Sequence, residues 1–148
     1  MRRAAYFFVM IRQGFHIGDR DWYVMVYYDV YPEQLDEIGD ALYASGASRE
    51  MVDGALDELR DKNTGYTFTN FRDHFTVIVI SHTTSAEQAF DTIIHEIKHL
   101  VEHISSYYGV NPKDELAAYL QGEVGRNMFT AIAMLVCPKC NDYRRNLI

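Results

Sequence analysis

Cysteine and positive charge are both scarce in this sequence. Its 148 residues include two cysteines, Cys137 and Cys140, so no disulfide framework holds the fold. Lysine and arginine together number 14 against 21 aspartates and glutamates, which leaves a formal net charge of −7. Phosphates and anionic lipids attract clustered cationic surfaces, and the sequence contains no such cluster. We therefore expect neither nucleic acid nor a membrane surface as the main partner.

Long apolar runs are also missing. No stretch approaches the roughly 18 consecutive apolar residues that a membrane helix needs. Two arginines precede an apolar run at residues 4–11, as in a secretory signal, but Arg12 and Gln13 close this short run and no small-residue cleavage site follows. We interpret the segment as a first strand and expect a cytoplasmic protein.

Linker-like composition is absent as well. No charge run and no stretch rich in Pro, Ser or Gly divides the chain, and its 48% hydrophobic residues suffice for one ordinary core. We predict a single domain over residues 1–136 and a C-terminal tail over residues 137–148. The CPKC motif of the tail is half of a zinc-ribbon ligand set. A closed site would need another subunit, so two reduced thiols are the simpler interpretation.

Residue patterns predict an α+β fold in the order ββααββαα. Aromatic and β-branched residues mark the strands, with Gly14 and Gly18 in the turn between the first two and residues 70–73 as a hairpin turn. The continuous apolar run at residues 77–80 indicates an interior strand. The predicted strands cover residues 6–11, 21–30, 66–71 and 74–80, and the predicted helices begin at Pro32, Ser48, Ser85 and Asn111.

The motif HEIKH occupies residues 95–99 of the helix that begins at Ser85. With about 3.6 residues per turn, His99 lies about 40° and Glu96 about 100° around the helix from His95. Apolar residues fill the opposite arc, so the helix presents one side to the core and its ionisable side to a cleft or to solvent. The apolar set is Ile93, Ile97, Leu100, Val101 and Ile104.

Two histidines four residues apart on a helix bring their imidazoles to one side, close enough to share a Zn²⁺ ion. A glutamate directly after the first histidine can reach a water on that ion, take its proton and return it to the leaving amine. His95 and His99 are therefore candidate zinc ligands, and Glu96 is the candidate catalytic residue. The other interpretation is the solvated face of an ordinary surface helix.

A hydrolytic zinc site needs a third protein ligand. Glu102 and His103 lie on the same rigid helix and would not complete a tetrahedral site. We favour Glu115 over Asp114, because Glu115 leads a polar stripe on the next helix whereas Asp114 is explained as a capping carboxylate. Small residues near this stripe would permit close approach of the two helices: Ala118, Gly122 and Gly125.

HEIKH followed by a turn and a helix that begins ELAAY resembles the zincin metallopeptidases, and within them the glutamate-ligand pattern of the gluzincins. The resemblance covers about residues 78–128 and is strongest to small stand-alone zincin-like proteins of phages and prophages. It implies a mixed β-sheet packed against helices, with an edge strand that holds an extended peptide. It also implies zinc ligation by His95, His99 and Glu115, with Glu96 as general acid and base.

The sequence thus predicts a zinc-dependent peptidase that acts on a peptide or protein substrate. The alternative is a non-catalytic protein of the same fold that binds a protein partner. Two features motivate that alternative: the chain is short, and Tyr119 stands four residues after Glu115, where thermolysin-type enzymes carry an aspartate. A chain of this length leaves an open cleft, or one that a partner or a homodimer completes.

Overall fold

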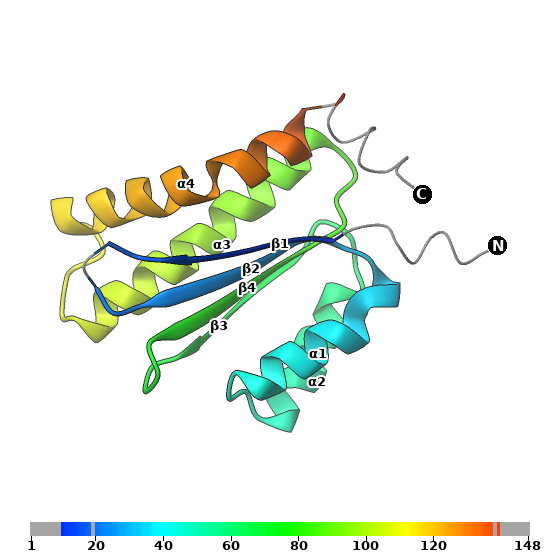
Figure 1. The fold of residues 1–148 in the computed structure, drawn as a ribbon, viewed down its shortest axis with the longest axis horizontal. Helices are drawn as coiled ribbons and strands as arrows, with labels where there is room; N and C mark the ends of the chain where they lie inside the picture. The colour runs from blue at the N-terminus through cyan, green and yellow to red at the C-terminus, as the bar shows by residue number, and fades with distance from the viewer. Residues whose placement is uncertain (1–9, 19, 138, 140–148) are drawn as a thin grey trace.

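The computed structural model describes residues 10–18, 20–137 and 139. Within these residues the chain forms a four-stranded mixed sheet and four α-helices, which confirms the α+β class and the predicted order of elements (Figure 1). In that part of the chain, no helix is both long and apolar enough to cross a membrane. The elements are β1 (Ile11–His16), β2 (Tyr23–Val30), the 3₁₀ turn η2 (Pro32–Gln34), α1 (Leu35–Ala44), α2 (Arg49–Leu59), β3 (Gly65–Asn70), β4 (Phe75–Ser81), α3 (Ala86–Tyr107) and α4 (Glu115–Val136).

The strands lie in the order β1-β2-β4-β3. β1 pairs with β2 and β3 pairs with β4 in antiparallel fashion, whereas β2 and β4 are parallel neighbours. A parallel pair needs a crossover connection, which α1, α2 and β3 provide here. β4 is therefore an interior strand, as its apolar run predicts, and β3 forms one edge of the described sheet.

Helices cover both faces of the sheet (Figure 1). α3 and α4 run antiparallel to each other over one face, while α1 and α2 cover the other. Successive side chains of a strand point to opposite faces, so the sheet contributes to two apolar clusters. Ile78 and Ile80 of β4 join the cluster with α3 and α4, and Val77 and Val79 join the cluster with α1 and α2. The apolar arc of α3 is buried in the first cluster, and α3 also contacts the edge strand β3.

Cap signals in the sequence match the starts of two helices. Ser48 Oγ accepts a hydrogen bond from the N–H of Met51 at 3.2 Å at the start of α2. Ser85 Oγ accepts one from the N–H of Gln88 at 3.1 Å at the start of α3. Each hydroxyl satisfies a donor that a helix start leaves without a backbone partner. Pro32 begins the 3₁₀ turn that leads into α1.

The first strand differs from its prediction. β1 is Ile11–His16 instead of residues 6–11, and residues 6–9 lie outside the described part of the chain. Gly14 is wrongly predicted as a turn residue, because it lies within β1 beside the Tyr23 side chain, whose hydroxyl would overlap a Cβ at this position. Gly18 does lie in the turn, at a φ of +42° that favours glycine.

The last helix begins later than the sequence predicts. Asn111 is the predicted cap, but α4 starts at Glu115 with Asp114 as its N-cap residue. Asn111 forms a turn instead. Its side-chain oxygen accepts a hydrogen bond from the N–H of Lys113 at 3.0 Å, and its carbonyl accepts one from the N–H of Asp114 at 2.9 Å. These bonds close a turn on the asparagine, so the helix starts only after it.

The glycines of α4 do not mediate its contact with α3. A Cβ on Gly122 or Gly125 would meet no atom within 4 Å, so the prediction that they allow close helix approach is wrong. Ala117, Leu120 and Val124 pack into the shared core instead. The glycines point into open space because the apolar stripe of α4 turns toward the sheet and α3.

Candidate metal centre

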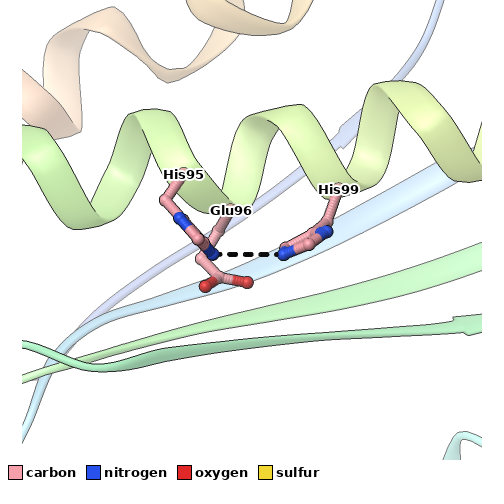
Figure 2. A group of neighbouring side chains, drawn as sticks. All are labelled: His95, Glu96 and His99. Carbon is pink, nitrogen blue, oxygen red and sulfur yellow. Dashed lines mark hydrogen bonds between the residues drawn. The ribbon is translucent and has the colours of Figure 1, made fainter. Parts of the chain in front are cut away.

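α3 places the two imidazoles of the motif side by side. His95 and His99 lie one helical turn apart, and their Nε2 atoms are 3.2 Å from each other (Figure 2). Two nitrogen ligands about 2.05 Å from a tetrahedral zinc ion lie about 3.3 Å apart. The pair therefore has the spacing of two ligands of one ion. The same distance allows one ring N–H to donate to the other ring nitrogen, so it also fits a simple histidine pair.

Glu96 joins these histidines in a group whose ligand atoms all lie within 4.8 Å of one another. His95 is exposed, whereas Glu96 is only 4% exposed. All three side chains project from α3 toward the strands, on the side away from α4 (Figure 2). Among the residues that the structure describes, this is the one cluster of three ligating side chains with metal-site spacing.

The carboxylate of Glu96 lies against the edge strand β3. Thr67 Oγ1 donates a hydrogen bond to Glu96 Oε1 at 2.6 Å. Gly65 leaves room for the same side chain, since a Cβ on Gly65 would lie 2.6 Å from Glu96 Cγ. Residues two apart on a strand share a face, so Gly65, Thr67 and Thr69 line the side of β3 that faces α3. This side of the strand therefore determines where the glutamate carboxylate lies.

His103 continues the row of histidines one turn beyond His99. Its Nδ1 lies 2.8 Å from Thr69 Oγ1. The chain of hydrogen bonds then runs inward from Thr69 to the Thr76 hydroxyl at 2.9 Å, which also accepts from Trp22 Nε1 at 3.0 Å. Burial lowers the pKa of His103 below its ordinary value, and the nearby His99 lowers it further. The His103 ring centroid is 6.4 Å from that of His99, and His103 is not part of the candidate metal-binding group of His95, Glu96 and His99.

Glu102 provides a carboxylate beside His99. Its Oε1 lies 3.7 Å from His99 Nδ1, and its Oε2 accepts a hydrogen bond from Lys98 Nζ at 2.9 Å. The bond from Lys98 lowers the pKa of Glu102, which keeps this carboxylate ionised. Negative charge near Nδ1 favours the tautomer that carries its proton there, and this leaves Nε2 of His99 able to ligate a metal.

Glu115 is not brought together with the two imidazoles. It is exposed in the first turn of α4 and is absent from the group formed by His95, Glu96 and His99. Its neighbours Leu116 and Ala117 line a small cavity with Tyr108, which lies nine residues beyond His99 along the chain. At about 1.5 Å per residue this is roughly 13 Å along the helix axis. The role of Glu115 as a zinc ligand stays a prediction, as does that of Asp114.

The CPKC motif lies partly beyond the described residues, because Pro138 and Cys140 are outside them. Its interpretation as reduced thiols or as half of a zinc ribbon therefore also stays a prediction.

Sequence patterns did not identify Gly65 and Thr67 as site residues. The alternation of Gly65, Thr67 and Thr69 in the predicted strand shows that small and hydroxyl side chains share one face. The same pattern is common on solvated strand faces. The partner of each side chain depends on how α3 packs on β3, and a sequence pattern within one strand does not show that packing.

A scan of protein-family models and searches of curated proteins and of solved structures found no match to this chain. The candidate metal centre therefore rests on its own geometry.

Proposed function

We propose that the protein is a zinc-dependent peptidase in which His95 and His99 ligate the ion and Glu96 transfers protons. The observation that carries this proposal is the 3.2 Å separation of the two Nε2 atoms, with the Glu96 carboxylate in the same 4.8 Å group. A zincin-like fold is part of the proposal. It is supported by the position of α3 beside β3, an edge strand that runs antiparallel to its neighbour.

The donor set suits zinc. Imidazole nitrogens are ordinary zinc ligands, and the separation of these two matches tetrahedral geometry. When bound, Zn²⁺ supplies Lewis acidity that polarises a peptide carbonyl and makes a water more acidic. With two ligands from α3, the ion would take its remaining ligands from outside the histidine pair. One zinc per two chains would indicate a single ion shared by the histidine pairs of a homodimer, whereas one zinc per chain would exclude such sharing.

In the proposed reaction, Glu96 acts first as a base and then as an acid. Its carboxylate accepts a proton from the attacking water as the water oxygen bonds to the carbonyl carbon. The same proton then passes to the amide nitrogen as the carbon–nitrogen bond breaks. The edge of β3 away from β4 offers backbone groups to which an extended peptide can add as another strand.

A non-catalytic protein with the same fold, acting on a protein partner, is the second candidate. The burial of Glu96 favours it, because a 4% exposed carboxylate with a hydroxyl donor also suits a purely structural role. The two candidates differ in what Glu96→Gln does. The substitution removes the base from a peptidase, but it leaves the effect of a binding protein intact.

Metal analysis and hydrolysis of labelled casein by the zinc-supplemented protein test the proposal. We expect Glu96→Gln to retain zinc and to lose hydrolysis by about 10²-fold or more, the size of effect that a general base contributes. His95→Asn and His99→Asn should lose zinc, whereas His16→Asn, at an exposed position in β1, should retain both properties. Equal hydrolysis by the wild type and Glu96→Gln would remove Glu96 from the mechanism. A wild type without zinc would refute the metal centre.

A further inference from the structure

We propose that Thr67 is a positioning residue for Glu96, holding the carboxylate in the orientation from which it takes up a proton. This inference rests on the proposed function. It adds to the motif a residue from a different element, since Thr67 lies on β3 and is 29 positions from Glu96.

The hydrogen bond between Thr67 and Glu96 is short. The Thr67 Oγ1 to Glu96 Oε1 distance is 2.6 Å, within the range of charge-assisted bonds from a hydroxyl to a carboxylate. The glutamate is 4% exposed, so water cannot replace this donor freely. A buried carboxylate that loses its donor is strongly disfavoured and turns toward another donor or toward solvent. Removal of the hydroxyl would therefore change where the carboxylate points.

Gly65 also restricts the position of the Glu96 side chain. A glutamate side chain has three rotatable bonds, and one hydrogen bond would leave it partly mobile. Gly65 closes one side, because its Cα lies so near that an added Cβ would be 2.6 Å from Glu96 Cγ and 2.8 Å from Oε2. Only a hydrogen in place of a side chain lets Glu96 lie there. Strand β3 thus restricts the glutamate side chain by a steric contact at Gly65 and a hydrogen bond from Thr67.

Comparison with Thr69 separates a positioning role of Thr67 from ordinary stabilisation. Thr69, two residues further along β3, makes a corresponding contact with α3, since its hydroxyl lies 2.8 Å from His103 Nδ1. Both threonines thus link β3 to α3, but of the two only Thr67 bonds to Glu96. Thr69→Val is therefore the matched control for the loss of one strand-to-helix hydroxyl.

Kinetics of casein hydrolysis by the zinc-loaded protein test the role. Thr67→Val should lower kcat by about 10-fold or more, the effect typical of groups that orient a metal-site residue. KM and bound zinc should stay within about twofold of wild type, and Thr67→Ser, which keeps the hydroxyl, should restore kcat. Thr69→Val should leave kcat close to that of wild type. A wild-type kcat in Thr67→Val, or no recovery in Thr67→Ser, would overturn the inference.

A second measurement does not depend on hydrolysis. Urea unfolding of the wild type, Thr67→Val, Glu96→Met and the double variant forms a double-mutant cycle. We expect Thr67→Val to destabilise the wild type much more than it destabilises the Glu96→Met protein, which lacks the carboxylate. Additive effects would refute the bond itself. Coupling together with a wild type that binds zinc but cleaves nothing would refute both the peptidase and the positioning role, and would leave Thr67 as a structural partner.

Discussion

Gly65 and Glu96 are in such close contact that the strand has room for only a hydrogen at this position. A Cβ built on Gly65 lies 2.6 Å from Cγ and 2.8 Å from Cδ of the glutamate. Real Cβ atoms do not approach other carbons this closely, so a side chain on Gly65 and the present position of Glu96 exclude each other. The contact connects a strand glycine to the residue on which the proposed chemistry depends.

Gly65→Ala should therefore disturb both stability and the site. Either Glu96 swings away from Thr67 or β3 moves from α3, and overpacking of this kind costs about 1–3 kcal/mol. We expect zinc to remain bound and hydrolysis to fall, as measured by metal analysis and casein cleavage. Gly54→Ala is the control, because a Cβ on Gly54 in α2 meets nothing within 4 Å. Alanine favours a helix over glycine by about 1 kcal/mol, so this variant should be more stable than wild type in urea. Unchanged stability and activity in Gly65→Ala would show that the strand and the glutamate are not in contact.

Glu102→Gln should weaken zinc binding without abolishing it. The substitution removes negative charge 3.7 Å from His99 Nδ1 and with it the preference for the tautomer that ligates through Nε2. Because Glu102 is 41% exposed, solvent screens the interaction, and we expect a loss at the low end of the range for such groups, about 10-fold or less. Competition with a chromophoric chelator measures the affinity. Glu50→Gln, in the first turn of α2, should have no effect, and an equal loss there would point to net charge instead of the contact.

Glu115→Gln tests the predicted third ligand, and with the helices arranged as in the structure it should leave zinc affinity unchanged. The structure places Glu115 at the start of α4, outside the group formed by His95, Glu96 and His99. A true third ligand would lower the affinity by far more than an outer residue such as Glu102. The same competition assay distinguishes the two results. A large loss of zinc in Glu115→Gln would show that α4 moves to bring this carboxylate onto the metal.

Deprotonation of the buried Tyr28 should lower the stability of the fold at alkaline pH. Its side chain is fully buried, its hydroxyl donates to Gln13 Oε1 at 2.9 Å, and burial raises its pKa above the ordinary value of 10.0. The folded state thus holds this proton more tightly than the unfolded state does. The stabilisation is complete below about pH 10 and is lost as pH rises further toward the folded pKa. Urea unfolding between pH 8 and 11 should show this decline, and Tyr28→Phe should make it shallower. An equally steep decline in Tyr28→Phe would assign it to other groups.

Much of this molecule follows from signals that lie a few residues apart. Ser48 and Ser85 cap helices because a hydroxyl can reach the N–H three residues ahead. Asn70 forms the hairpin turn because its side-chain oxygen accepts from the N–H of Asp73 at 3.0 Å. His95 and His99 face each other because helix geometry alone brings positions four apart together.

Predictions failed where a tertiary contact or a competing local turn overrides the expected preference. Gly14 has the composition of a turn, but it lies in β1, where the Tyr23 side chain leaves no room for a Cβ. Asn111 has the composition of a helix cap, but it closes a turn of its own and α4 begins at Glu115.

The sequence by itself determined the class of fold, the order of its elements and the pairing of two imidazoles on α3, because these depend on residues within one or two helical turns. Tertiary structure alone decided that Thr67 and Gly65 hold Glu96 and that Glu115 lies near the C-terminal end of α3, away from the two imidazoles. Those relationships depend on how a strand and two helices pack, and packing is set by the whole apolar core instead of by any short stretch of residues.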